Sequence, residues 1–212
     1  MPIIFQHSFL EGPQLAVWKI VEPLDFFETT VPDSSNILHP QVRLRHVAAR
    51  YLLNALHPGF PYHQLQISES GKPYLSGECL HFSLSHCGDF AAAIVSEKGS
   101  VGVDLEASGD RIFRIRHKFL SDQEQAVIQK IAGLSDLQRG ALASRWLTRA
   151  WSAKESVYKW QGKAGIDFIR DIQIVNVDLA TQELQINFTP SERLLRVNYH
   201  SLEGLELTWL RN

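Results

Sequence analysis

The sequence Val-Gly-Val-Asp-Leu-Glu over residues 101–106 alternates apolar and polar side chains, which is the pattern of a β-strand. Because neighbouring side chains on a strand point to opposite faces, the apolar residues share one face, and the other carries Gly102, Asp104 and Glu106. Two carboxylates on one face repel each other unless a positive group lies beside them. The segment therefore predicts either a cation site on a strand or a strand that ends in a solvated acidic turn.

The composition is typical of a soluble globular protein. The chain has 212 residues, of which 44% are hydrophobic and 21% are charged, and its formal net charge is −2. This length allows one large domain or two small ones with a core that needs no disulfides. The near-neutral charge argues against nucleic acid or an anionic membrane as the partner. Two cysteines, no signal-peptide pattern and no long apolar window favour a cytoplasmic protein.

The chain contains a coarse internal repeat in the order of its predicted elements. A helix is followed by a hairpin and a pair of strands at residues 40–56, 65–75 and 81–96, and again at residues 137–160, 169–188 and 194–210. This order predicts an α+β fold of two similar halves related by a pseudo-twofold axis. We expect an N-terminal half over residues 1–98 and a C-terminal half over residues 99–212.

The second long helix carries a polar stripe at spacings of three and four residues, formed by Ser144, Thr148, Ser152, Glu155 and Lys159. A Glu and a Lys one turn apart are usually an exposed ion pair on a solvated face. Here Glu155 is also a third carboxylate to join Asp104 and Glu106. Mg²⁺ prefers oxygen ligands and keeps positions open for substrate phosphates. Three carboxylates with a lysine beside them indicate a phosphate-transfer site.

Two segments resemble the signature motifs of the 4'-phosphopantetheinyl transferase superfamily: Gly-Val-Asp-Leu-Glu at residues 102–106 and Trp-Ser-Ala-Lys-Glu-Ser-Val-Tyr-Lys at residues 151–159. The intervening Lys-Phe-Leu-Ser segment at residues 118–121, followed by Glu124, also resembles the family. Further resemblances are Gly-Lys-Pro at residues 71–73, Phe-Ser-Leu-Ser-His at residues 82–86, and the Arg-bearing helix over residues 40–56. The length and the repeat resemble the surfactin-synthetase-type, pseudodimeric class. Cys87 departs from the family, which commonly has Ser or Thr after the Ser-His pair.

The resemblance implies transfer of the 4'-phosphopantetheine group from coenzyme A to a serine of an apo acyl or peptidyl carrier protein, with release of adenosine 3',5'-bisphosphate. It implies Mg²⁺, or Mn²⁺ in its place, bound by Asp104, Glu106 and Glu155. Lys159 and Lys154 would offset the charge on the leaving phosphate. The base for the serine proton would be Glu155 itself or a metal-bound water.

Five residues are assigned to coenzyme A by the resemblance: Arg43, Arg50, Lys72, Ser85 and His86. Arg43 and His86 would meet the 3'-phosphate, and Lys72 and Ser85 would lie near the adenine and the phosphates. For the two arginines, the simpler alternative is a solvated helix face. For His86 it is a turn after a strand.

A basic run predicts the docking patch for an acidic carrier protein, through Arg111, Arg114, Arg116 and Lys118. The alternative is a solvated loop with buried apolar members. The internal duplication makes a monomer the expected state. Two other functions use the same residues: a metal-dependent phosphodiesterase and a non-catalytic module that binds coenzyme A.

Overall fold

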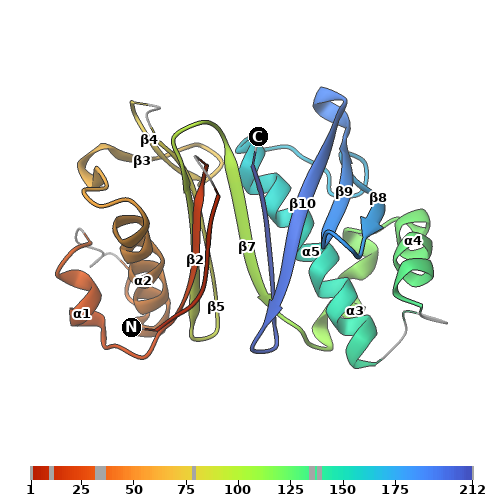
Figure 1. The fold of residues 1–212 in the computed structure, drawn as a ribbon, viewed down its shortest axis with the longest axis horizontal. Coiled ribbons are helices and arrows are strands. Elements are labelled where there is room, and N and C mark those ends of the chain that lie inside the picture. The colour runs from red at the N-terminus through yellow and green to blue at the C-terminus, as the bar shows by residue number, and fades with distance from the viewer. Residues whose placement is uncertain are drawn as a thin grey trace. The chain divides into compact units, whose positions relative to one another are not determined.

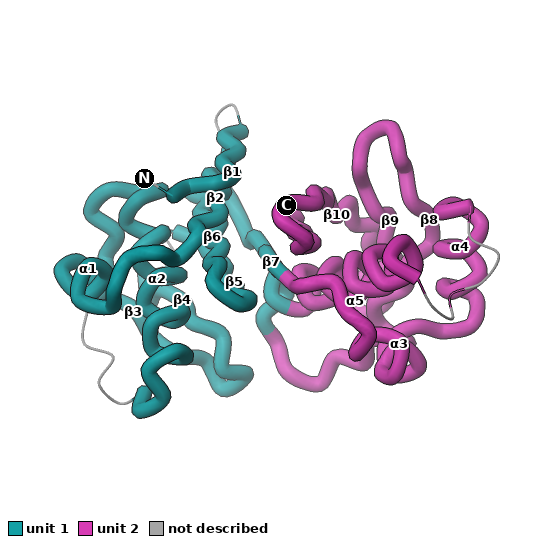
Figure 2. The backbone as a smooth tube through the Cα atoms, turned by 90° about the horizontal axis from the view of Figure 1, so that it is seen from below, with its two compact units in different colours: residues 1–105, 159–162, 211–212 teal, residues 106–158, 163–210 magenta. Residues whose placement is uncertain are grey.

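The computed structural model describes residues 2–9, 12–31, 37–77, 80–133, 137 and 140–211. The chain forms two compact units, shown in Figure 2: unit 1 contains residues 1–105, 159–162 and 211–212, and unit 2 contains residues 106–158 and 163–210. The first division falls inside strand β7 (Val101–Ala107), and the helix α5 (Ala141–Gln161) ends in residues of unit 1. The signature segments identified in the sequence thus lie where the chain passes from one unit to the other.

Unit 1 is an antiparallel sheet with helices (Figure 1). Before β7 its elements are β1 (Ile3–Ser8), β2 (Gln14–Lys19), α1 (Leu24–Glu28), α2 (Pro40–Leu56), the 3-10 turn η1 (Tyr62–Gln64), β3 (Leu65–Ile67), β4 (Pro73–Leu75), β5 (His81–Cys87) and β6 (Phe90–Ser96). Four strands form a sheet in the order β1-β2-β6-β5, and β3 pairs with β4 in a separate hairpin. The helix expected over residues 40–56 is confirmed, with Pro40 in its first turn, where proline costs no hydrogen bond.

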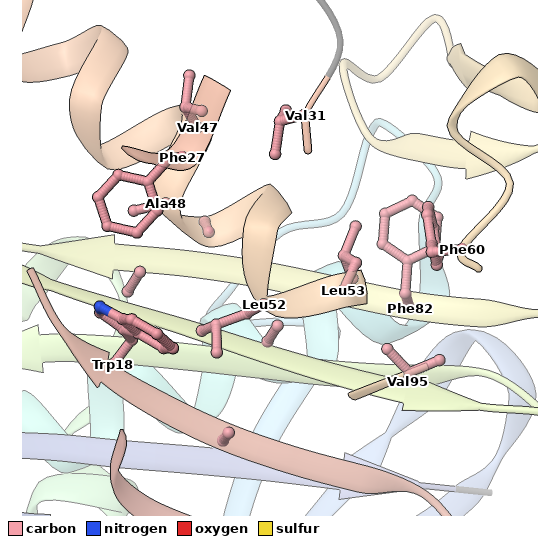
Figure 3. Close-up of a cluster of buried hydrophobic side chains, with 14 of the residues drawn as sticks. Trp18, Phe27, Val31, Val47, Ala48, Leu52, Leu53, Phe60, Phe82 and Val95 are labelled. Carbon is pink, nitrogen blue, oxygen red and sulfur yellow. The ribbon is translucent and has the colours of Figure 1, made fainter. Parts of the chain in front are cut away.

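Helix α2 packs on β2, β5 and β6 and covers one face of this sheet. Its buried residues Val47, Leu52 and Leu53 meet Trp18 and Phe82 of the sheet in one hydrophobic cluster (Figure 3). These apolar residues therefore form the packing face of the helix.

The opposite face of the sheet is also buried, and it includes two serines of β5. Ser83 and Ser85 are alternate residues of this strand, and both are buried. Their hydroxyls accept hydrogen bonds from backbone N–H groups of β7: Val103 N donates to Ser83 Oγ at 3.1 Å, and Leu105 N donates to Ser85 Oγ at 3.2 Å. Buried backbone donors need a partner, and here serine side chains provide it.

Unit 2 contains the second sheet. Its remaining elements are α3 (Arg111–Ile115), the 3-10 turn η2 (Arg116–Lys118), α4 (Asp122–Ala132), β8 (Ile172–Asp178), β9 (Glu183–Phe188), the 3-10 turn η3 (Thr189–Ser191), β10 (Arg193–Leu202) and β11 (Leu205–Arg211). The last four strands are antiparallel, in the spatial order β11-β10-β9-β8. Two antiparallel sheets, each with its own helices, confirm the predicted α+β class. No helix among the described residues has the length and hydropathy that crossing a membrane requires.

Helix α5 differs from its prediction in two respects. It begins at Ala141 and not at residue 137, and residues 138–139 lie outside the described part of the chain. The first half of its polar stripe is also buried: Ser152 Oγ lies 3.0 Å from Thr208 Oγ1 of β11, and the neighbouring Ser156 Oγ lies 2.7 Å from the same atom. Small hydroxyl side chains let a helix approach a strand closely while their polar atoms stay hydrogen-bonded. The stripe is therefore partly internal packing, and only Glu155 and Lys159 remain half-exposed.

Candidate active site

Asp104 of β7 is the central carboxylate of the candidate site in unit 1. Its side chain is buried, and its Oδ1 accepts hydrogen bonds from Lys159 Nζ at 2.6 Å and from Ser85 Oγ at 2.9 Å. Lys159 stands in the last turn of α5, and Ser85 comes from β5. This contact brings together residues from three segments singled out in the sequence, at residues 82–86, 102–106 and 151–159.

The second oxygen of Asp104 fits the role of a metal ligand. Asp104 Oδ2 is buried and has no hydrogen-bond partner. A buried charged oxygen without a partner is unfavourable, and a divalent cation satisfies it directly. Glu106 and Glu155 are half-buried and belong to unit 2. In the part of the chain that the structure describes, no group of three or more Asp, Glu, His or Cys side chains is arranged so that it could hold a metal ion.

A cluster of basic side chains occupies the same unit. The imidazole of His86 lies near Arg45, Arg50 and Lys159, and that of His46 lies near Arg50 and His86. In the described ranges no carboxylate pairs with Arg45, Arg50 or His86, and Arg45 Nε is buried without a hydrogen-bond partner. Arg45 and Arg50 are thus cations without an acidic partner among the described residues, which suits the binding of an anion.

The pKa values of this cluster reflect its burial and its charge. Burial, followed by Arg50 and His86, lowers the pKa of His46 to about 4. The ring of His86 is partly open to solvent, but the surrounding protein and then Lys159, Arg45 and Arg50 lower its pKa, against a backbone hydrogen bond that raises it. Burial also lowers the pKa of Arg50, whose carbonyl accepts a hydrogen bond from the Tyr62 hydroxyl. The lowered pKa values favour the neutral form of both imidazoles.

Two members of this cluster, Arg45 and His46, were missed by the sequence reasoning. His46 precedes Arg50 by four residues, so the spacing places both on one face of α2 and provides a usable signal. The resemblance assigns Arg43, like Arg50, to coenzyme A. In the structure it forms an ion pair with Glu28 of α1, and it therefore reaches toward a different element.

Lys72 lies at the β3–β4 hairpin and packs against the end of α5. Gly162 stops this helix with φ +72°, and a Cβ atom there would lie 3.1 Å from Cδ of Lys72. The hairpin also contacts the end of α5, because Ser70 Oγ donates a hydrogen bond to the Gly162 carbonyl at 3.0 Å. Together with Phe82 and Trp160, Lys72 lines a cavity of about 410 Å³ in unit 1. Burial lowers the pKa of Lys72, because the charged form is poorly solvated there. A nearby anion would stabilise this charged form.

A family comparison now adds to this geometry. The model of the 4'-phosphopantetheinyl transferase superfamily matches residues 100–209, slightly more than half of the chain. The chain belongs to this superfamily. The matched residues include both signature segments, and the enzyme class expected from the sequence, a 4'-phosphopantetheinyl transferase, is confirmed.

Individual relatives agree with this assignment. The 4'-phosphopantetheinyl transferase AcpT of Salmonella typhi is 31% identical over 153 residues, which cover 70% of this chain and 72% of the relative. The protein of the same name from Escherichia coli (strain K12) is 32% identical over 139 residues, or 64% of each chain. A putative 4'-phosphopantetheinyl transferase of Haemophilus influenzae is 31% identical over 103 residues, covering 47% of this chain and 40% of that protein. These relatives support the pseudodimeric class that the two α+β halves indicate.

Lys154, within the transferase motif, is fully buried. Its ammonium group lies 2.5 Å from Glu124 Oε1 and donates to the Phe168 carbonyl at 2.7 Å. Glu124 also accepts hydrogen bonds from the backbone N–H groups of Ser121 and Ile174 and closes the capping box of α4. Burial lowers the pKa of Lys154, and Glu124 opposes this shift. The described contacts of Lys154 are therefore internal to unit 2 and tie α4, α5 and β8 together.

The basic run of the transferase forms α3 and the turn η2. Arg111, Arg114 and Lys118 are exposed, whereas Arg116 is half-buried and donates to the Leu137 carbonyl. Arg111 lines a cavity of about 160 Å³ in unit 2, together with Glu106, Ile112, Thr148 and Trp151. Three of the four basic residues are thus open to solvent, and one of them lies at the same cavity as a candidate metal ligand.

The ion pair of Lys154 and Glu124 leads to a stability prediction. Lys154→Met leaves a buried carboxylate without its cation, so we expect the free energy of unfolding to fall by about 3–5 kcal/mol. The double variant Glu124→Gln/Lys154→Met removes both charges and should recover most of this loss. Urea denaturation measures both effects. Lys130→Met, at an exposed lysine of α4, is the control and should change stability by at most about 0.5 kcal/mol. A Lys154→Met variant as stable as the control would contradict the role of the pair.

Proposed function

We propose that this transferase moves the 4'-phosphopantetheine group of coenzyme A to a serine of an apo acyl or peptidyl carrier protein and releases adenosine 3',5'-bisphosphate. The contact of Lys159 with Asp104 carries the proposal, because it joins the two signature segments at a carboxylate that keeps one unpartnered oxygen. We also propose that the enzyme is cytoplasmic, since two cysteines in 212 residues suit a reducing compartment. The internal duplication makes a monomer part of the same proposal.

Asp104, Glu106 and Glu155 are the proposed ligands of Mg²⁺, or of Mn²⁺ in its place. When bound, the cation neutralises charge on the pyrophosphate oxygens. The orphaned Oδ2 of Asp104 supports this assignment, and oxygen-only ligands suit a hard cation.

In the proposed reaction, the carrier serine oxygen attacks the β-phosphorus of coenzyme A. A new bond joins this oxygen to phosphorus, and the bond from phosphorus to the bridging oxygen breaks, so that oxygen leaves with adenosine 3',5'-bisphosphate. Glu155 takes the serine proton, directly or through a water. Lys159 offsets the negative charge that develops on the leaving phosphate. Little covalent chemistry is required of the protein, so positioning and charge stabilisation carry the catalysis.

The basic cluster of unit 1 is the proposed site for the adenosine bisphosphate end of coenzyme A. Arg50 and His86, together with Arg45 and His46, provide donors that no described carboxylate neutralises. Lys72 extends the positive charge along the cavity beside Trp160 and Gly162. Arg43 remains a proposed contact of the 3'-phosphate, but binding there would have to compete with its ion pair to Glu28.

The carrier protein is proposed to dock at the exposed basic residues of α3 and η2. Carrier proteins are generally acidic, which suits Arg111, Arg114 and Lys118. Arg116 is directed to the Leu137 carbonyl, so it would contribute mainly by supporting this surface.

The decisive experiment is mass spectrometry of apo carrier proteins after incubation with the enzyme, coenzyme A and Mg²⁺. We expect a gain of roughly 340 Da on the carrier serine, the mass of the transferred group. Asp104→Ala and Glu155→Ala should abolish the gain while the circular dichroism spectrum is retained. Full activity in either variant would refute the metal assignment. Hydrolysis of coenzyme A without carrier modification would indicate a phosphodiesterase, and binding without either reaction would indicate a non-catalytic module.

Binding of adenosine 3',5'-bisphosphate should strengthen as the pH falls through the pKa values that His46 and His86 have in the complex. The pKa values of His46 and His86 are lowered in the free protein, and a bound phosphate favours the protonated rings. The complex therefore holds more protons than the free protein, so lower pH favours binding. Isothermal titration calorimetry in buffers of different ionisation enthalpy measures this proton uptake. In the double variant His46→Gln/His86→Gln, only the phosphates of the ligand can still take up protons. Equal proton uptake by the wild-type protein and the double variant would contradict the assignment.

Charge reversal tests the docking surface. We expect Arg114→Glu to raise the KM for the carrier protein by roughly 10-fold, because attraction between opposite charges becomes repulsion. The KM for coenzyme A should not change. Lys130→Glu places the same charge change on exposed α4 and should leave both constants close to wild type. The same KM for carrier in the Arg114 and Lys130 variants would exclude α3 as the docking surface.

A further inference from the structure

The hydroxyl group of Ser85 has its single hydrogen-bond donor committed to β7. A serine hydroxyl offers one donor and two acceptor lone pairs. The donor is directed to Asp104 Oδ1 at 2.9 Å, and one lone pair accepts from Leu105 N at 3.2 Å. The coenzyme A phosphates accept hydrogen bonds, so a contact with them needs a donor. In this arrangement Ser85 has no donor left for them.

The same hydroxyl orients the carboxylate of Asp104. Its contacts with Oδ1 and with the N–H group of the next residue restrain both the side chain and the backbone of β7. Oδ1 also accepts from Lys159 Nζ, so this oxygen has two donors. Oδ2, buried and without a partner, is then the oxygen left for a cation.

Lys159 is less suited to this orienting role. Its ammonium group ends a flexible four-carbon stem, and the proposed reaction draws it toward the leaving phosphate. Ser85 is short and buried, and a single side-chain torsion places its hydroxyl. The serine can therefore keep Asp104 oriented while the lysine moves between carboxylate and phosphate.

We propose that Ser85 is a positioning residue that acts through Asp104, and that it is not a coenzyme A contact. Its hydroxyl holds Oδ1 so that Oδ2 faces the divalent cation. This inference rests on the proposed function, because the cation is the one required for transfer. It also assigns Ser85 a role different from the one that the resemblance implies.

Ser83 provides a matched control. It lies two residues before Ser85 on β5, is also buried, and accepts a hydrogen bond from Val103 N at 3.1 Å. No hydrogen bond of the described structure joins it to Asp104. Ser83→Ala and Ser85→Ala thus each remove one hydroxyl link between β5 and β7, but only the second removes a donor from the carboxylate.

The test is a titration of the full-length protein with Mn²⁺, followed by electron paramagnetic resonance, with saturating coenzyme A and no carrier protein. We expect Ser85→Ala to weaken Mn²⁺ binding by roughly 10-fold, as is common when a residue that orients a metal ligand is removed. Ser83→Ala should stay within about 2-fold of wild type under the same reasoning. Ser85→Cys, of similar size but a weaker donor, should fall between them. The dissociation constant for coenzyme A, measured without divalent cations, should be the same in all four proteins.

Equal Mn²⁺ affinity in the Ser83→Ala and Ser85→Ala variants would overturn the inference. So would weaker coenzyme A binding in Ser85→Ala without divalent cations, since that result identifies a direct contact. If Ser85→Ala does not fold, the comparison of Ser85→Cys with Ser83→Ala decides in the same way. Absence of transfer by the wild-type protein to any apo carrier would refute the proposed function instead, and the Mn²⁺ titration would still decide the role of Ser85.

Discussion

The candidate site depends on one carboxylate oxygen that accepts two hydrogen bonds. Asp104 Oδ1 receives Lys159 Nζ and the Ser85 hydroxyl, and the other oxygen of the same group is buried without a partner. This arrangement leaves Oδ2 as the oxygen that a cation can satisfy. The lysine, the serine and the aspartate come from α5, β5 and β7, so the end of α5 and the two strands must be in place before this arrangement exists.

Serine and threonine hydroxyls recur in both units where elements have to approach closely. Ser83 and Ser85 accept from the backbone of β7 in unit 1, and Ser152 and Ser156 meet Thr208 in unit 2. Such groups satisfy buried polar atoms without the volume of a larger side chain. Unit 2 adds the fully buried pair of Lys154 and Glu124, which fixes the motif helix against α4 and β8. Within the motif, Lys154 therefore holds the helix in place, whereas Glu155 and Lys159 remain partly exposed.

Periodicity and motif order predicted much of the fold and the superfamily. The helix at residues 40–56, the capping box of Ser121 and Glu124 and the order of strands in each half follow from local rules, because capping and amphipathic patterns act over a few residues. The same rules left open where the polar stripe of α5 faces, since a polar residue at regular spacing can face either solvent or a polar strand. They also missed Arg45 and His46, which lie near His86 of a distant strand.

By itself, the sequence determined the α+β class and the signature segments, and it supplied the candidate carboxylates and most of the candidate basic residues. Only the tertiary structure decided how individual donors are used. It placed Lys154 in an internal ion pair, Arg43 beside Glu28, and the single donor of Ser85 on Asp104. The physical reason is that a hydrogen bond or ion pair between residues far apart in the chain depends on distance and direction, whereas a sequence motif records only which groups are present and in what order.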